Sequence, residues 1–403
     1  MFIRQFWAVV AGTTLVLTGT AGMAPIAAAS GGRVATPPLV VKTFGRLPDG
    51  TPRFARSGPT GLSPSAIQGV YSLSGLSPRS GAGTGQTIAI VDAYHDPNAL
   101  NDLNAFDKQY GYPRLSTCTQ GQTSACFSQY DPQGTPSVNT GWVLEESLDI
   151  EWAHAEAPGA RIILVEAASS GLTDLFNAVV YANGLGATEV SMSWDSLEFG
   201  TETAFDADLA RAGTFYTVAS GDTGNHQGYP AASPNVIAVG GTTLTGCSGT
   251  SCSGFSGETA WSSSGGGVSA YESIPGYQSG YTGPVYGGGT GIASLTGTNR
   301  GIPDVSFDAG TDVSIYDSTR YYGQSGWFSV GGTSVGAPNW AGILAAGTAA
   351  GKTALQGDAA IYGGGYSNLR DITSGTDGSC VPDCTAGTGY DLVTGLGSPV
   401  NYP

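Results

Sequence analysis

The residue best suited to covalent chemistry is a serine in a glycine-rich turn. Ser334 follows Gly332 and Thr333 and stands before an apolar stretch that we predict to be a helix. Gly332 can adopt a backbone geometry that other residues resist. A serine at a helix N-terminus lies in a positive local field that favours developing negative charge. Ser334 is therefore a candidate nucleophile, and the alternative is that it only caps the helix.

Two acids at helical spacing are the candidates for activating this serine. Glu145 and Asp149 are four residues apart in a predicted helix, so both project from one face. If that face is exposed, it is an ordinary solvated surface. If it is buried beside Ser334, the two carboxyls can share a proton, with one pKa raised and the other lowered. A carboxylate could then take the serine proton.

A third acid follows an apolar run in the sequence Ser220-Gly221-Asp222. An exposed aspartate in a glycine-flanked turn often forms an Asx-turn, in which its side chain hydrogen-bonds to the backbone nearby. The functional alternative is that a protonated Asp222 donates a hydrogen bond to the oxyanion of a tetrahedral intermediate. This works only while the carboxyl keeps its proton.

A histidine-based triad is the main chemical alternative. An enzyme of the subtilisin type requires Asp, His and Ser in that chain order. Asp92 is a plausible start, but His95 is only three residues further on. His154 lies at a predicted helix end without a His-Gly-Thr setting, and His226 follows the Asp222 turn. We therefore predict that His154 is a packed or helix-capping residue.

Alternating apolar runs and helical segments predict an α/β fold. Buried parallel strands are expected at 87–92, 161–166, 189–194, 214–219 and 235–240. Helices are expected between them at 97–110, 142–154, 172–183 and 202–212. Such alternation favours a sandwich with a parallel sheet, whose functional sites gather at the carboxyl ends of the strands. The Gly/Ser/Tyr-rich stretch 246–301 is predicted to form surface loops.

Composition limits the possible partners and the compartment. The formal net charge of −16 argues against nucleic acid and anionic membranes as partners. Residues 1–29 have the positive start, apolar stretch and small-residue site of an export signal. Residues 30–59 lack periodicity and are predicted to be a linker or short pro-segment, and 60–403 are predicted to be the catalytic domain. No later segment is apolar and long enough to span a bilayer.

The cysteines indicate local disulfides in an exported chain. The six cysteines form three close pairs, and none has the Cys-x-x-Cys spacing: Cys118 with Cys126, Cys247 with Cys252, and Cys380 with Cys384. The histidines are scattered along the chain. The sequence therefore disfavours a zinc site.

From about Gly61 to the C-terminus, the chain resembles the sedolisin family of serine-carboxyl peptidases (peptidase family S53). The resemblance depends on the order of several short motifs: Ile90-Val91-Asp92-Ala93-Tyr94, the Glu145/Asp149 helix, Ser191-Met192-Ser193-Trp194, Ser220-Gly221-Asp222, Tyr229-Pro230-Ala231-Ala232-Ser233-Pro234, Ala238-Val239-Gly240-Gly241-Thr242 and Gly332-Thr333-Ser334. It implies a subtilisin-like three-layer sandwich with a mostly parallel central sheet.

The resemblance also implies roles for individual residues. Ser334 would be the nucleophile, Glu145 the general base, Asp149 its support, and Asp222 part of the oxyanion hole. Ser193, Trp194 and Gly221 are expected to line an extended substrate cleft, where a peptide adds as a strand. The expected protein is a secreted, monomeric, acid-active endopeptidase that acts on proteins or peptides. A tripeptidyl exopeptidase and an inactive binding protein on the same fold are the alternatives.

One structural Ca²⁺ ion is implied near the C-terminus. Asp371 and Asp391 would supply carboxylates, and Ile372, Gly387 and Gly389 would supply carbonyl oxygens. As bare sequence, these residues also suit turns. The chain differs from the usual pattern of the family, in which a long folded propeptide precedes the catalytic domain. Here only about thirty residues separate the predicted signal from the catalytic match, which is too few for a separate stable domain. Folding unaided or with a separately supplied helper is therefore expected.

Overall fold

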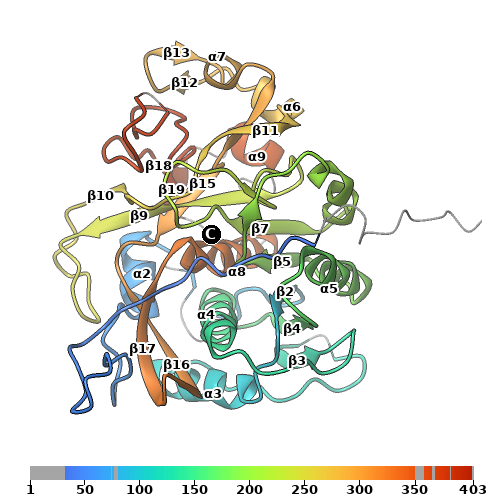
Figure 1. Cartoon of the computed structure of the whole chain (residues 1–403), viewed down its shortest axis with the longest axis vertical. Coiled ribbons are helices and arrows are strands. Elements are labelled where there is room, and N and C mark those ends of the chain that lie inside the picture. The colour runs from blue at the N-terminus through green and yellow to red at the C-terminus, as the bar shows by residue number, and fades with distance from the viewer. Residues whose placement is uncertain are drawn as a thin grey trace, which may run out of the picture.

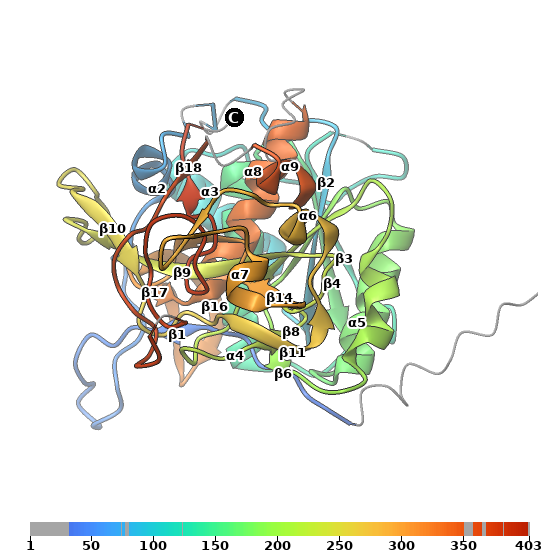
Figure 2. The same ribbon diagram turned by 90° about the horizontal axis from the view of Figure 1, so that it is seen from above.

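The computed structural model describes residues 32–73, 75–76, 80–122, 124–349, 358–364, 368–381 and 383–401. The predicted export signal at 1–29 lies outside these residues. Figures 1 and 2 show the chain from two directions at right angles. None of the described helices combines the length and the apolar character that a membrane span requires.

A central, mostly parallel sheet organises the molecule. Its strands follow the order β10-β9-β7-β5-β2-β4-β3, and β15 pairs with β9 in parallel. Only β10 runs antiparallel to its neighbour. The bounds are β2 (Thr87–Ala93), β3 (Cys126–Tyr130), β4 (Arg161–Ala167), β5 (Glu189–Met192), β7 (Phe215–Ala219), β9 (Ile237–Thr245), β10 (Gly257–Ala260) and β15 (Val305–Asp308). All five predicted strands are present, whereas the sequence did not indicate β3.

Helices cover both faces of this sheet (Figure 1). One face carries α3 (Ala99–Tyr110), α4 (Thr140–Glu156) and α8 (Gly336–Ala349), and the other carries α5 (Leu172–Gly184). Side-chain alternation along β2 explains this, because Ile88 and Ile90 pack with the α4 and α8 side while Ala89 and Val91 pack with α5. The predicted three-layer sandwich is confirmed. The last predicted helix is a 3₁₀ helix, η1 (Glu202–Leu209).

The remaining elements are short and lie around the sandwich. The stretch 246–301, which we expected to be loops, contains several short strands and helices in addition to loops. The remaining elements of the whole described chain are α2 (Pro64–Val70), β6 (Ser196–Leu197), β8 (Gly228–Tyr229), β11 (Gly267–Ser273), α6 (Gly276–Ser279), β12 (Pro284–Val285), β13 (Gly289–Thr290), α7 (Ala293–Thr296), β14 (Asn299–Ile302), β16 (Val313–Tyr321), β17 (Gln324–Gly331), η2 (Thr333–Val335), α9 (Asp358–Tyr362), β18 (Leu369–Arg370) and β19 (Ser398–Pro399).

The cysteine pairing predicted from the sequence is confirmed. The disulfides join Cys118 to Cys126, Cys247 to Cys252, and Cys380 to Cys384. Each closes a loop of at most eight residues in sequence separation.

The segment that the sequence suggested as a linker packs against the rest of the fold. We call residues 33–42 the N-terminal strap. Thr36 forms an antiparallel bridge with Asp195, and β1 (Val40–Val41) pairs antiparallel with the end of β17. In Figure 1 the strap is the blue trace that crosses the face of the molecule in front of α8. It therefore lies between two elements that flank the predicted active site.

Candidate active site

Ser334 lies in a tight turn between β17 and α8. Gly332, just after β17, has φ of 116°, and η2 then leads directly into α8. A side chain at Gly332 would collide with the carbonyl oxygen of Pro38 and with Oδ2 of Asp222, so glycine is required there for space as well as for conformation. The turn delivers the Ser334 side chain into the interior, where it is fully buried.

The acid pair lies on the buried helix α4. Asn139 caps this helix, since its Oδ1 accepts hydrogen bonds from Gly141 N at 3.1 Å and Trp142 N at 3.4 Å. Glu145 and Asp149 are both 0% exposed. The solvated-face alternative is therefore wrong for these residues. The helix α4 also packs against η2, which carries Ser334, and the Ser334 side chain lies next to the Glu145 carboxyl.

The contacts among these residues define a reactive centre. Ser193 Oγ donates a hydrogen bond of 2.9 Å to Asp149 Oδ1 and lies 3.4 Å from the Ser334 carbonyl oxygen. The Ser334 hydroxyl lies close enough to Glu145 to lower the pKa of that carboxyl, although the two groups do not reach full hydrogen-bond geometry. A small movement of either side chain would complete the contact.

Burial determines the electrostatics of the pair. It is the largest cause that raises the pKa of both Glu145 and Asp149 well above the ordinary range, and the charge of nearby Asp92 raises both further. The sequence suggested one raised and one lowered pKa, but here both are raised. Three carboxyls so close together in a buried site cannot all be ionised, so the group retains protons well above pH 4.

Asp222 lies on the other side of the Ser334 turn. Its Oδ1 accepts hydrogen bonds from Thr333 N at 2.8 Å and from Thr333 Oγ1 at 2.9 Å. Its Oδ2 is buried and lacks a partner. Burial raises the pKa of Asp222 to about 7. In acid the carboxyl is neutral, and the free Oδ2 is the position from which it can donate a hydrogen bond.

Asp92 is a member of this site that the sequence analysis did not assign to it. Its carboxyl is fully buried, without a hydrogen-bond partner, and burial raises its pKa. The signal was available in the strand alternation. Asp92 shares the face of β2 that carries Ile88 and Ile90, and that face is the one covered by α4.

The residues expected to line the substrate cleft have different surroundings. The Trp194 side chain is fully buried, donates from Nε1 to Val91 O at 2.8 Å, and packs edge-on against Phe176. Only its backbone could therefore face a substrate. Ser193 holds Asp149, as described above. Gly221 N donates to Thr333 Oγ1 at 3.1 Å, so it orients the turn that contacts Asp222.

The histidine alternative has little support from the geometry. His154 is fully buried on α4, and its Nε2 lies 3.2 Å from Pro113 O and 3.4 Å from Asp107 Oδ1. Burial lowers the pKa of His154 to about 4. These contacts are those of a packed histidine. His95 contacts Glu166 and Asp131 instead.

The predicted calcium ligands come together in one loop region. Asp371 Oδ2 accepts a hydrogen bond from Gly389 N at 3.0 Å, and Asp391 Oδ2 accepts one from Gly387 N at 2.9 Å. Asp391 is buried, and burial raises its pKa to about 7. Ile372 is buried beside Asp371.

Comparison with known proteins agrees with this geometry. Residues 138–357 match the model of the subtilase family. Sedolisin of Pseudomonas sp. (strain 101) is 33% identical over 353 residues, which cover 77% of this chain and 56% of that protein. The chain is a subtilase of the sedolisin family. Kumamolisin of Bacillus sp. (strain MN-32) is 29% identical over 381 residues, which cover 86% of this chain and 64% of that protein.

Solved structures place the fold in the same family. Pseudomonas sedolisin, a serine-carboxyl proteinase complexed with two molecules of pseudo-iodotyrostatin, matches with a TM-score of 0.67 and 29% identity, over 85% of this chain and 96% of that one. A psychrophilic protease at 18% identity and a TM-score of 0.51 shows the shared fold alone. The chain spans 43% to 64% of the length of its curated sedolisin relatives.

Proposed function

We propose that this protein is an acid-active serine-carboxyl endopeptidase that hydrolyses peptide bonds through an acyl-enzyme on Ser334. The observation that carries the proposal is the burial of Glu145 and Asp149 beside the helix turn that bears Ser334. A buried carboxyl with a raised pKa is a stronger base than an exposed one once it is ionised. Pseudomonas sedolisin, which is named as a serine-carboxyl proteinase, supports the same reaction class.

The proposed mechanism uses the acids where a histidine triad uses imidazole. Glu145 takes the proton of Ser334 Oγ as that oxygen attacks the carbonyl carbon of the peptide. Glu145 then returns the proton to the leaving amine, and water later attacks the acyl-enzyme by the reverse route. Asp149, held by Ser193, stabilises the protonated form of its neighbour. Asp222 donates its proton-bearing Oδ2 toward the oxyanion, because its Oδ1 is already held by Thr333.

This mechanism restricts activity to acid. Asp222 must be protonated to donate, and its pKa is about 7. The fraction of molecules with a competent oxyanion donor therefore falls as the pH rises through that value. Glu145 must also hold the proton that it takes from Ser334 until it passes that proton to the leaving amine.

We also propose that the N-terminal strap must move before a substrate can bind. The Ser334 hydroxyl is fully buried, so a peptide carbonyl cannot reach it in this conformation. The strap pairs with Asp195 next to Trp194, and the Pro38 carbonyl oxygen lies against Gly332. It therefore lies beside the backbone where an extended substrate is expected to pair. This suits the role of a short pro-segment within residues 30–59.

A structural Ca²⁺ site at the C-terminal loop fits the residues present. Two carboxylates twenty residues apart in the chain, Asp371 and Asp391, reach the same short glycine segment. Within the described part of the chain, no Lys, Arg or His forms an ion pair with either carboxylate. Together with the carbonyls of Ile372, Gly387 and Gly389 they make an all-oxygen donor set, which is the kind that Ca²⁺ prefers. The ion would hold the loop. Chelation should lower the Tm of the wild type but not of Asp371→Ala.

We further propose that the protein is secreted as a monomer and has no nucleic-acid or membrane partner. The predicted export signal and the three disulfides support secretion, and the net charge of −16 argues against nucleic-acid and anionic membrane partners. Size-exclusion chromatography of protein recovered from the culture medium of a producing cell would test both secretion and oligomeric state.

A casein digestion tests the main proposal. Purified calcium-loaded protein assayed from about pH 3 to 7 should release peptides, and release should decline as the pH approaches the Asp222 pKa of about 7. The Ser334→Ala variant is the control for contaminating peptidases. No cleavage by folded protein, with the strap removed by limited proteolysis, would favour the inactive binding protein. Sequencing the products from a mixed peptide library would separate internal cleavage from release of tripeptides.

A further inference from the structure

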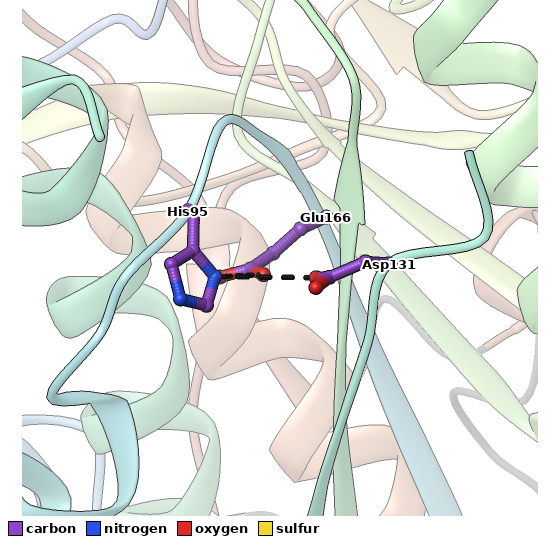
Figure 3. A group of neighbouring side chains, drawn as sticks. All are labelled: His95, Asp131 and Glu166. Atoms are coloured by element: carbon purple, nitrogen blue, oxygen red, sulfur yellow. Dashed lines mark hydrogen bonds and ion pairs between the residues drawn. The ribbon is translucent and has the colours of Figure 1, made fainter. Parts of the chain in front are cut away.

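A second cluster of titratable side chains lies apart from Ser334, at the carboxyl ends of three neighbouring strands. His95 follows β2, Asp131 directly follows β3, and Glu166 lies near the end of β4. Because these strands are adjacent and parallel, their ends bring the three side chains together. Figure 3 shows the Glu166 carboxyl between the imidazole of His95 and the Asp131 carboxyl.

The distances within this cluster suit a shared metal ion. His95 Nδ1 lies 2.7 Å from Glu166 Oε2 and 4.0 Å from Asp131 Oδ1, and all three atoms lie within 4.8 Å of one another. Ligand atoms about 2.0–2.2 Å from a tetrahedral Zn²⁺ are separated from each other by about 3.3 Å. The observed distances lie on both sides of that value, so shifts of well under an ångström per side chain would form the site.

Neighbouring groups hold each carboxylate by one oxygen and leave the other facing the centre. Glu166 Oε1 accepts hydrogen bonds from Asp96 N and Gln129 Nε2, both at 2.7 Å. Asp131 Oδ2 accepts one from Thr135 Oγ1 at 2.6 Å. The remaining oxygens, Glu166 Oε2 and Asp131 Oδ1, are the ones close to His95. Such outer hydrogen bonds fix ligand orientation in metal sites.

Two further observations identify buried carboxyl oxygens that a cation could neutralise. Asp131 Oδ1 is buried and has no hydrogen-bond donor. Glu146 is fully buried on α4, both of its carboxyl oxygens lack a donor, and its carboxyl interacts directly with that of Glu166. Buried carboxylates without donors are costly unless protons or a cation neutralise them.

We propose that His95 Nδ1, Asp131 Oδ1 and Glu166 Oε2 form a binding site for a divalent transition metal, with Zn²⁺ as the best-fitting ion. An imidazole nitrogen with two carboxylate oxygens suits Zn²⁺ better than Ca²⁺, which prefers oxygen ligands alone. The side chains of His95 and Asp131 are 23% and 20% exposed, so an ion can enter and water can complete its coordination. The sequence disfavoured zinc because its histidines are scattered, but this site needs only one of them.

The test is a zinc titration of the folded chain. The protein carries Ser334→Ala to prevent self-digestion, and excess Ca²⁺ fills the C-terminal loop. Isothermal titration calorimetry with ZnCl₂ at about pH 7 should give one site per chain. Asp131→Asn and His95→Gln should each weaken binding by roughly tenfold or more. Asp49→Asn, which removes a fully exposed carboxylate elsewhere, is the matched control and should bind as the parent does.

A spectroscopic probe separates loss of a ligand from loss of folding. Co²⁺ in place of Zn²⁺ should give visible absorption bands that His95→Gln changes in position and intensity, while circular dichroism shows an unchanged fold. Both tested side chains are partly exposed, which favours folding of the variants. Absence of binding in the parent, or equal affinity in the parent and both ligand variants, would overturn the proposal.

Discussion

The two ends of helix α4 carry ionisable side chains that are equally buried but differ in what they contact. Near its start, Glu145 and Asp149 face the turn that bears Ser334. At its end, His154 and Glu156 are just as inaccessible. His154 contacts a backbone carbonyl and Asp107, whereas Glu145 lies beside a hydroxyl that is free of other partners.

This difference shows that burial alone does not identify a catalytic group. Burial shifts the pKa of the groups at both ends of the helix, upward for the acids and downward to about 4 for His154. A neutral buried imidazole would be a reasonable base by its titration behaviour. Its Nε2 contacts Pro113 O and Asp107 Oδ1, and neither group is a nucleophile for acyl transfer at this site. The neighbour of the shifted group, and not the shift, is what favours Glu145 over His154 as the proposed base.

The largest effect should come from removing the nucleophile. Ser334→Ala should reduce kcat/KM for a peptide substrate by about 10⁴-fold or more, because no other hydroxyl occupies that position. The Tm should change little, since the lost atom makes no hydrogen bond in the structure. Residual cleavage near the wild-type rate would show that the chemistry lies elsewhere.

Glu145→Gln should be nearly as damaging, by about 10³-fold or more, because glutamine keeps the shape but cannot accept a proton. Initial rates at about pH 4 would measure this. If Glu145→Gln retained most of the activity while a His154 variant lost it, His154 and not Glu145 would be the base.

Asp222 should affect the rate less than Glu145. Asp222→Ala should lower kcat by about 10²- to 10³-fold through loss of an oxyanion donor. Asp222→Asn should lose less, because its amide can still accept from Thr333 and donate toward the oxyanion at any pH. The wild type should lose activity as the pH rises through about 7, where Asp222 ionises, and the Asp222→Asn substitution should flatten that part of the profile. A wild-type plateau through pH 8 would contradict the mechanism.

The free energy of unfolding should fall as the pH rises, because buried acids on and beside α4 have raised pKa values in the folded protein. Burial raises the pKa of Glu156 to about 8, that of Asp107 on the neighbouring helix α3 to about 8, and those of Glu145 and Asp149. A raised folded-state pKa contributes stability that is complete below the unfolded value near 4 and is lost as the pH passes through the folded value. Thermal melts of Ser334→Ala should show a Tm that decreases between about pH 4 and pH 8. A flat profile would mean that these acids are screened in solution.

The smallest catalytic effect should come from His154. His154→Gln keeps a donor for Pro113 O and should change kcat/KM by less than about threefold, with a modest loss of Tm from altered packing. The matched comparison is Glu145→Gln on the same helix, assayed under the same conditions. A large loss of kcat in a fully folded His154→Gln variant would show that His154 also takes part in the reaction.

Much of this arrangement was predictable from the sequence. The parallel strands, the helix with Glu145 and Asp149, and the Gly332-Ser334 turn each have a local signal in residue spacing. β3 was missed because Cys126–Tyr130 is short and has neither a continuous apolar run nor a strict alternation of apolar and polar residues. Asp92 was weighed only as the start of a histidine triad, although its position on the face of β2 was readable. The packing of the strap and the meeting of His95, Asp131 and Glu166 depend on strand order, which no local pattern encodes.

The strap has one more consequence, which concerns competition. A segment tethered to its own groove is present there at an effective concentration in the millimolar range, whatever the dilution of the protein. Free peptides would therefore have to compete with the strap at that effective concentration. A single backbone cut between the strap and the domain would turn the contact into an ordinary bimolecular one, and dilution would then favour release of the strap.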